Sequence, residues 1–210
     1  MKIILFYLFL ICNLLICKAL KSQNDWKLKS EKKGVLIYSR KVKGSKVKAF
    51  KGIATINAPL KKLYDLLVNH NDYPSWVYRC AEGKTLEKIS DTEYYVYLVT
   101  DSPWPASERD DVTHVKIVKA PDGTVVFDMK DEPDYLPQRK SRVRVPFLEG
   151  YWKLAPLEEE KTKVIYEVLA NPGGRIPAWL ANHFIIEAPL KSLLNMKKKV
   201  ESRGSGVRGF

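Results

Sequence analysis

The sequence predicts an α+β fold in which a curved antiparallel sheet wraps around a long C-terminal helix. Three observations support this fold class. Two β-rich runs precede one short amphipathic helix, a long stretch then alternates with period two, and an apolar stripe with helical spacing closes the chain. No linker rich in Pro, Gly and Ser divides residues 25–203 of this 210-residue chain, so we expect one domain.

The first elements are a strand pair and a helix. Residues 34–42 and 46–56 are β-rich and are separated by a Gly-Ser turn, which indicates a hairpin. Asn57 is predicted to cap a helix over residues 57–70, and Pro59 suits its first turn. The apolar positions of this helix recur with a period of 3.6 and are Leu60, Leu63, Tyr64, Leu67 and Val68.

Six further strands are predicted from the period-two pattern. Asp122 and Gly123 form a strong hairpin signal between two of them. Because short turns join these strands, neighbours are expected to run antiparallel. The predicted strands cover residues 78–89, 93–100, 111–119, 124–131, 141–154 and 163–170.

The last predicted element is a long helix over residues 176–200. Pro177 can open this helix, and Pro189 is expected to kink it. Because a bent sheet and a straight helix cannot touch along their full lengths, a gap should remain between them, and such gaps are natural ligand cavities. The apolar stripe consists of Trp179, Leu180, Phe184, Ile185, Leu193, Leu194 and Val200.

Residues 1–19 are predicted to be a secretory signal peptide. Lys2 precedes an apolar run, and the small residues Cys17 and Ala19 form a cleavage site before Leu20. Lipid attachment at Cys17 and an uncleaved membrane anchor remain as alternatives, although the run is short for a span of about twenty residues. Cleavage removes Lys2 and Lys18 and lowers the net charge from +12 to +10. We therefore expect a basic, exported protein, periplasmic or extracellular.

Cysteine and histidine usage argues against metal chemistry. Cys80 is the one cysteine left after residues 1–19 are removed, so no disulfide within the chain is expected. The three histidines, His70, His114 and His183, show no metal-ligand spacing. The sequence thus predicts neither a metal site nor a cofactor.

Seven segments stand in an order that is typical of one family. They are WKLKSEKKGVLIYSR, FKGIATINAPLKKLYDLL, YPSWVYRC, WPASERD, RVRVPFLEGYWKLAP, TKVIYEV and NPGGRIPAWLAN, and the resemblance that they carry covers residues 26–200. In this order they resemble START (StAR-related lipid-transfer) domains, especially exported bacterial ones. The resemblance implies a helix-grip fold over residues 20–203, with an internal tunnel for one lipid or other apolar small molecule. Residues 204–210 are expected to be a flexible tail.

The resemblance and the strand pattern together select nine candidate ligand-binding residues. Tyr166 and Val168 fall on the inner face of their strand, and the Tyr166 hydroxyl could meet either a ligand or a backbone carbonyl. Trp152 is interpreted more readily as core than as a ligand contact. Tyr97 is assigned to the cavity side of its strand. The full set is Tyr97, Trp104, Arg109, His114, Trp152, Tyr166, Val168, Trp179 and Phe184.

The loop WPASERD raises a specific structural expectation. Trp104 should act as an apolar plug, and Arg109 beside Asp110 should be buried only if it is paired or hydrogen-bonded. Arg109 then serves as a strut for the loop or as a ligand contact. Arg142 and Arg144 are expected on a solvated outer face.

The segment NPGGRIPAWLAN is predicted to be a mobile lid. Gly173 and Gly174 precede the helix that carries Trp179 and Phe184 to the open end of the tunnel. A turn with left-handed backbone is the plainer interpretation of the two glycines, and both can hold.

The leading functional hypothesis is a carrier or sensor of one apolar molecule, driven by apolar burial. An enzyme of the cyclase or hydrolase type is the first alternative, with His114, Tyr166, Asp128 and Arg109 as candidates, although no Ser-His-Asp, Cys-His or metal pattern supports it. The buried charged pair of sterol-binding family members has no match after Arg109.

A peripheral membrane protein is the second functional alternative. Residues 18–51 contain twelve Lys or Arg residues and two acidic residues, and this excess of positive charge suits an anionic membrane surface. No nucleic-acid-binding motif is present, and a monomer is expected.

Overall fold

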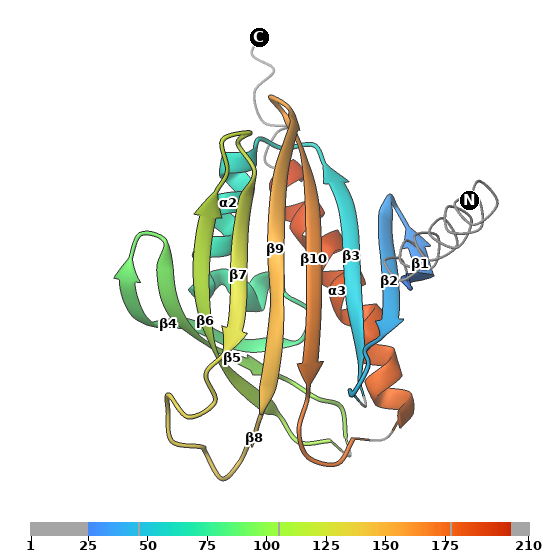
Figure 1. Cartoon of the computed structure of the whole chain (residues 1–210), viewed down its shortest axis with the longest axis vertical. Helices are drawn as coiled ribbons and strands as arrows, with labels where there is room; N and C mark the ends of the chain where they lie inside the picture. Colours follow the sequence, from blue (N-terminus) through green and yellow to red (C-terminus); the bar gives the residue numbers. More distant parts are fainter. Residues whose placement is uncertain (1–24, 46, 105, 177, 203–210) are drawn as a thin grey trace, which may run out of the picture.

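The computed structural model describes residues 25–45, 47–104, 106–176 and 178–202 (Figure 1). The predicted signal peptide and tail lie outside these residues, as do Lys46, Pro105 and Pro177. The described chain contains a ten-stranded sheet and two α-helices. The predicted α+β class, with a curved antiparallel sheet and a long C-terminal helix, is confirmed.

The sheet has the strand order β1-β2-β3-β10-β9-β7-β6-β5-β4. These neighbours all pair antiparallel, and β8 joins separately by a short parallel pairing with β6. The strands are β1 (Lys27–Lys32), β2 (Val35–Lys41), β3 (Lys48–Ile56), β4 (Cys80–Ser90), β5 (Glu93–Thr100), β6 (Arg109–Lys119), β7 (Val125–Asp131), β8 (Val143–Arg144), β9 (Phe147–Glu158) and β10 (Lys161–Asn171).

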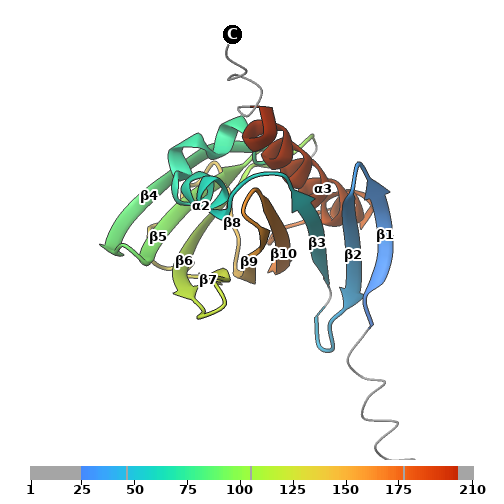
Figure 2. The ribbon, with the colours of Figure 1, turned by 90° about the horizontal axis from the view of Figure 1, so that it is seen from above.

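The helices lie on one face of the sheet, which curves around them (Figures 1 and 2). They are α2 (Leu60–Val68), a 3-10 helix η2 (His70–Ser75) and α3 (Ala178–Glu201). The helix α3 packs against β1, β2 and β3, whereas α2 packs against β9 and η2 against β4. The two halves of the sheet are therefore covered by different helices.

The start of α2 differs from the prediction. Pro59 occupies the position before the first helical residue and makes no side-chain cap, so the predicted capping role of Asn57 is wrong. The Asn57 backbone N–H instead donates to the Glu201 carboxylate at 2.9 Å, near the end of α3. This bond ties the connection between β3 and α2 to the last turn of the long helix.

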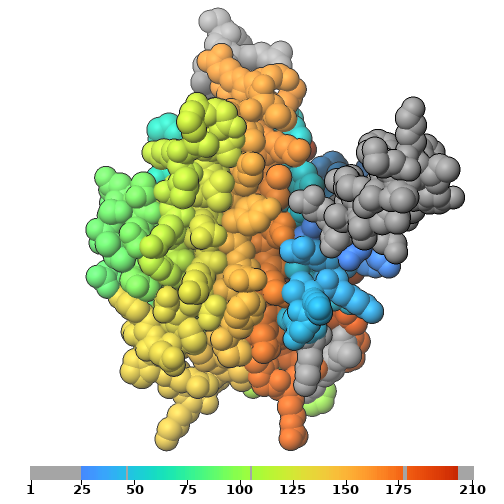
Figure 3. All heavy atoms as spheres, in the orientation of Figure 1, coloured from blue at the N-terminus to red at the C-terminus, as the bar shows by residue number. Residues whose placement is uncertain are grey.

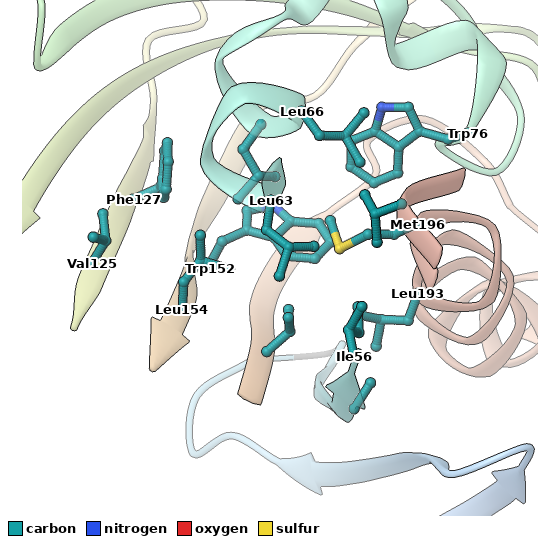
Figure 4. Close-up of a cluster of buried hydrophobic side chains, with 14 of the residues drawn as sticks. Ile56, Leu63, Leu66, Trp76, Val125, Phe127, Trp152, Leu154, Leu193 and Met196 are labelled. Carbon is teal, nitrogen blue, oxygen red and sulfur yellow. The ribbon is translucent and has the colours of Figure 1, made fainter. Parts of the chain in front are cut away.

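The apolar core fills the space between the helices and the upper part of the sheet in Figure 1. Figure 4 shows side chains from α2, β7, β9 and α3 that point toward one another. Because apolar side chains are buried from both layers, this core stabilises the packing of helices on sheet. Its labelled members are Ile56, Leu63, Leu66, Trp76, Val125, Phe127, Trp152, Leu154, Leu193 and Met196.

Gly52 lets α3 approach β3 closely. A Cβ atom at this position would lie 2.5 Å from Leu193 Cδ1 and 3.2 Å from Ile37 Cδ1. Leu193 is fully buried, and α3 runs as one helix through Pro189, which packs near the same glycine. The absence of a side chain on Gly52 thus sets how near the helix sits to this half of the sheet.

Two strands depart from the predicted pattern. The strand β1 was not predicted, because its sequence KLKSEK is almost entirely exposed and carries no apolar alternation. The predicted strand over 141–154 is divided into β8 and the start of β9, with Pro146 between them. Proline lacks the backbone N–H that a continuous ladder would need.

A loop over residues 132–142 and the short β8 cover the outer face of β5 and β6. Arg144 is 8% exposed and donates from Nε and Nη2 to the two oxygens of Asp110, at 3.1 and 3.0 Å. Tyr97 also donates to Asp110, at 3.1 Å, and receives a bond from Arg142 at 2.9 Å. The expectation that Arg142 and Arg144 lie on a solvated face is therefore wrong. The resulting pair is bidentate, as is typical of arginine with carboxylate.

Replacing Leu193 with alanine tests the contact between α3 and β3. We expect Leu193→Ala to lower the free energy of unfolding by about 2–5 kcal/mol, because it leaves a cavity over Gly52. Leu157→Ala, at a position that is 51% exposed on β9, should change it by no more than about 0.5 kcal/mol. Urea unfolding of the full chain followed by tryptophan fluorescence measures both. Equal losses in the two variants would contradict the packing described.

Candidate functional site

A cavity lies between the concave face of the sheet and the helices. Its inner part has a volume of about 180 Å³, and its outer part about 230 Å³. The two parts share part of their lining and therefore lie next to each other. The shared residues are Thr100, Asp111, Leu148, Tyr166, Val168, Phe184 and Ala188.

The alternation of the central strands determines which side chains reach the cavity. On β5 the lining residues are Val96, Leu98 and Thr100. Tyr95 and Tyr97 alternate with them and point to the outer face. The opposite wall comes from α3, where Phe184, Ala188 and Ser192 follow one another at helical spacing. On β6 the lining residues are Asp111, Thr113 and Val115.

Aromatic rings form one wall of the cavity. The rings of Trp152 and Tyr166 stack with centroids 3.7 Å apart and planes 6° apart, and Phe50 meets Tyr166 edge-on at 5.0 Å. Burial raises the pKa of Tyr166, and the charge of Asp111 adds to this. Within the described ranges, the Tyr166 hydroxyl makes no hydrogen bond, although it borders the cavity. It is therefore available to a ligand.

Asp111 is the buried acid of the site. It is 6% exposed, lines both parts of the cavity, and accepts one hydrogen bond from the Thr113 hydroxyl at 2.9 Å. Burial raises its pKa to about 7, against an ordinary value of 3.8; the Thr113 bond opposes this shift, and the charge of Asp110 reinforces it. Asp111 thus carries a proton over much of the acidic range.

His70 stands at the inner end of the cavity. Its side chain is buried, and Nδ1 lies 2.8 Å from the Thr85 hydroxyl. Burial lowers the pKa of His70 to about 4, so the ring is neutral near pH 7. The neighbouring Tyr73 hydroxyl donates to the Leu67 carbonyl at 2.7 Å. His70 and Tyr73 thus each have a hydrogen-bond partner within the protein.

The outer part of the cavity opens at the lower end of the molecule in Figure 1. Its edge combines the β2–β3 hairpin, the loop after β5, the loop after β10 and the first turns of α3. Figure 3 looks onto the outer face of the sheet, where β7, β9 and β10 form a continuous surface. The lining residues nearest these loops are Val47, Ser102, Arg109, Pro172, Ile176 and Ala181.

Arg109 lies beneath the loop after β10. It is 5% exposed, and it donates from Nη1 to the Ser107 carbonyl. A Cβ atom on Gly174 would lie 3.8 Å from Arg109 Nη2. The carboxylate of Asp110 is held by Arg144 and not by Arg109. The buried Arg109 is hydrogen-bonded, as expected, but to a backbone carbonyl. Arg109 keeps the expected place as a strut under the loop, with a backbone partner.

Comparison with known proteins identifies the family. The START domain family model matches residues 12–200. The chain belongs to the START domain family. A START protein of Xanthomonas axonopodis, described as a STAR-related lipid transfer protein, is 35% identical; the match covers 85% of this chain and 99% of that one, with a TM-score of 0.79.

Other relatives agree with this assignment. An uncharacterized Pseudomonas aeruginosa protein is 41% identical over 179 residues, which are 85% of this chain and 88% of that protein. Human StAR-related lipid transfer protein 5 shares the fold with 20% identity and a TM-score of 0.79, covering 93% of this chain and 97% of its own. A Streptomyces aromatase/cyclase has the same fold at 13% identity and a TM-score of 0.52, over 77% of this chain and 98% of its own.

Five of the nine predicted site residues line the START cavity. Trp152, Tyr166, Val168 and Phe184 belong to the lining of the inner part, and Arg109 to that of the outer part. The expected inward direction of Tyr166 and Val168 on β10 is correct. Their contact with a ligand stays a prediction.

Tyr97 and His114 lie on the opposite face of the sheet. Tyr97 is buried under the loop over residues 132–142 and bonds Asp110 and Arg142, so its assignment to the cavity is wrong. His114 stacks on Tyr95 at 4.6 Å and bonds Glu93 at 2.8 Å, outside the cavity. The histidine that lines the cavity is His70, which was not among the predicted site residues.

Trp104 and Trp179 are exposed. Trp104 is 90% exposed, and its expected role as a buried plug is wrong. Trp179, in the first turn of α3, is 62% exposed and does not contribute to the cavity lining. Both belong to segments that border the opening, so they mark the rim of the site and not its interior.

Asp111 was not predicted as a site residue, although the alternation of side chains along β6 indicates that it faces the cavity. Residues 109, 111, 113 and 115 share one face, so placing Arg109 inside also places Asp111 and Thr113 there. The signal was ambiguous because both faces of β6 are buried from Arg109 to Thr113, one by the cavity wall and the other by the outer loop.

The described part of the chain holds no cluster of three metal-ligating side chains. Of the four residues considered for catalysis, His114 and the exposed Asp128 lie outside the cavity, and Arg109 and Tyr166 line it. The Cys80 thiol is buried, and burial raises its pKa to about 11, which keeps it protonated. The site is thus an apolar space with a few buried polar groups.

The raised pKa of Asp111 predicts how stability depends on pH. The unfolded chain releases this proton near pH 4 and the folded protein near pH 7, so folding binds the proton more tightly and stability falls as the pH rises between these values. We expect Asp111→Asn to raise the free energy of unfolding by about 1–4 kcal/mol at pH 8 and to change it little at pH 4. Urea unfolding at both pH values measures the difference.

Asp128→Asn provides the matched control for this measurement. Asp128 is exposed on the outer face of β7, so its variant should unfold like the wild type at pH 8. If Asp111→Asn raised the free energy of unfolding equally at pH 4 and pH 8, this result would contradict the account of the buried acid.

Proposed function

We propose that this START protein binds one lipid or other apolar small molecule in the cavity, as a carrier or a sensor. The observation that carries the proposal is the cavity between the concave sheet and α3, whose two adjoining parts are lined mainly by apolar and aromatic side chains. Two relatives with the same fold are described as lipid transfer proteins, which supports this proposal.

Apolar burial supplies the binding energy. Each Å² of apolar ligand surface removed from water contributes about 25 cal/mol before the costs of association. The wall offers stacked rings and aliphatic side chains for this purpose, including Trp152, Phe127 and Leu148. A few polar groups then orient the ligand, as is usual in small-molecule sites.

The segment from the end of β10 into α3 is proposed as the lid of this cavity. Gly173 and Gly174 both have left-handed backbone, with φ of 66° and 60°, which other residues rarely adopt. Pro172, Ile176 and Phe184 line the outer part of the cavity from this segment. A rotation at the two glycines would move these side chains and widen the entrance.

A membrane surface is the proposed source or destination of the ligand. Exposed Trp104 and Trp179 border the opening, and tryptophan favours the interface of a bilayer. The loops at this end also expose Lys43, Arg139, Lys140 and Arg175, which suit anionic lipids. No helix in the described part of the chain is long and apolar enough to cross a membrane.

An enzymatic role is the weaker candidate. The aromatase/cyclase relative shows that this fold occurs in an enzyme, and Tyr166 and Arg109 are the two considered residues that reach the cavity. The mainly apolar lining favours the carrier or sensor.

Filling the cavity tests ligand binding. Ala188 lies on α3 and lines both parts of the cavity, so we expect Ala188→Trp to weaken binding of the fluorescent probe N-phenyl-1-naphthylamine at least about 10-fold, by occupying ligand space. Lys198→Trp places the same side chain at an exposed position of the same helix and should bind like the wild type. Equal affinity in all three proteins would refute the cavity as the binding site.

Liposome pelleting tests the proposed membrane contact. The double variant Trp104→Ser and Trp179→Ser should pellet less with phosphatidylglycerol vesicles than the wild type, because it loses two interfacial anchors. Leu157→Ser, at the turn between β9 and β10 on the opposite end of the molecule, is the control. Pelleting of the wild type should also decrease as the salt concentration rises. If pelleting depended neither on salt nor on the two tryptophans, the rim of the opening would not be the membrane contact.

A further inference from the structure

Asp111 is a buried carboxyl group with an unfilled hydrogen-bonding capacity. A carboxyl group can accept about four hydrogen bonds when ionised, and Asp111 receives one from Thr113 in the described structure. It is more than nine-tenths buried and lines both parts of the cavity. A buried polar group without enough partners is costly, so the structure provides a reason for a ligand to supply them.

No arginine among the described residues forms a salt bridge with Asp111. Arg144 donates to both oxygens of Asp110 on the other face of β6, and its Nη1 donates to the carbonyls of Pro133 and Leu136. Arg109 donates to the Ser107 carbonyl. Arg144 therefore acts on Asp111 through its charge alone, without a direct bond, from the other face of β6.

The surroundings of Asp111 favour a ligand with a donor group. Tyr166, which makes no hydrogen bond within the described ranges, lines the same two parts of the cavity and feels the charge of Asp111. The other residues that both parts share are Thr100, Leu148, Val168, Phe184 and Ala188. Around Asp111 this region therefore combines the hydroxyls of Tyr166 and Thr100 with otherwise apolar side chains.

We propose that Asp111 accepts a hydrogen bond from a hydroxyl or amine group of the ligand, so that the ligand class is an apolar alcohol or amine and not a carboxylic acid. This inference rests on the proposed binding of an apolar molecule in the cavity. At pH values above the raised pKa of Asp111, its carboxyl group is ionised and a ligand carboxylate would meet a like charge in a medium of low dielectric constant. An alcohol or an ammonium group supplies the donor that Asp111 lacks.

Arg109 does not change the expected preference for an alcohol or amine over a carboxylic acid. It lies in the outer part of the cavity, below the loop after β10, and belongs to the lining of the outer part alone. Asp111 lies two residues along the same face of β6 and also lines the outer part, so an anionic head group at Arg109 would still be close to the ionised acid and repelled by it.

A matched series of twelve-carbon ligands tests the inference. Dodecylamine, dodecanol and dodecanoate differ in the head group alone, and each can displace N-phenyl-1-naphthylamine from the wild-type full chain. We expect the amine and the alcohol to bind about 10- to 100-fold more tightly than dodecanoate, as a hydrogen bond to a charged group allows.

Two substitutions at Asp111 separate charge from hydrogen bonding. Asp111→Asn should weaken the binding of dodecylamine about 10-fold or more. Asp111→Leu should weaken the binding of both dodecylamine and dodecanol. Dodecanoate should bind to each variant as tightly as to the wild type, or more tightly. Asp128→Asn removes the same charge from the outer face and should bind all three ligands like the wild type. Circular dichroism and retained probe binding verify that each variant is folded.

The outcomes distinguish the inference from the proposed function. If neither the probe nor any twelve-carbon ligand binds the wild type, the cavity does not hold apolar molecules, and both proposals fail. If the probe binds but dodecanoate matches the amine and the alcohol, or both Asp111 variants keep the wild-type order, the assignment of Asp111 is overturned while apolar binding stands.

Discussion

The packing of α3 on one half of the sheet is the constraint on which the rest of the structure depends. Leu193 sits against Gly52 of β3, and α3 contacts β1, β2 and β3. The other half of the sheet curves away and is covered by α2 and η2 instead. A straight helix cannot follow that curvature, so a space remains along its first half, between Phe184 and Ser192. The cavity is a consequence of where the helix is held.

The outer loop makes this arrangement possible at β6. A strand with a cavity on one side lacks a packed neighbour there, so the opposite side must hold it in place. Asp110 does so through Arg144 and Tyr97, in a bidentate pair buried under residues 132–142. Removing one partner of such a pair usually costs about 3–5 kcal/mol, since the other charge stays buried. The network fixes the strand that presents Asp111 to the cavity.

The order of elements and the family could be predicted from the sequence, because they depend on local patterns. Period-two runs and the Asp122-Gly123 turn give the strands, and helical spacing gives α3. The faces of the strands could not be predicted where both are buried. Tyr97 and His114 were placed inside because nothing in the sequence reveals that a distant loop covers the outer face of β5 and β6. Long-range contacts of this kind have no local signature.

Trp104 illustrates the opposite error, a residue that was predicted to be buried and is exposed. Apolar character alone placed Trp104 in the interior, whereas its side chain is almost fully exposed at the rim of the opening. An exposed large aromatic residue is informative because water is an unfavourable surrounding for it. The rim and the buried acid thus give the cavity two chemically different regions, one suited to a bilayer and the other to a polar group of the ligand.

Native mass spectrometry of the full chain, purified without detergent and then incubated with a lipid extract, tests the central claim most directly. The account predicts one non-covalent adduct per chain, which dissociates on collisional activation and releases an apolar molecule that can be identified by its mass. A protein that stays at its bare mass with every extract, or that takes up many molecules in a graded series, would contradict a single internal site.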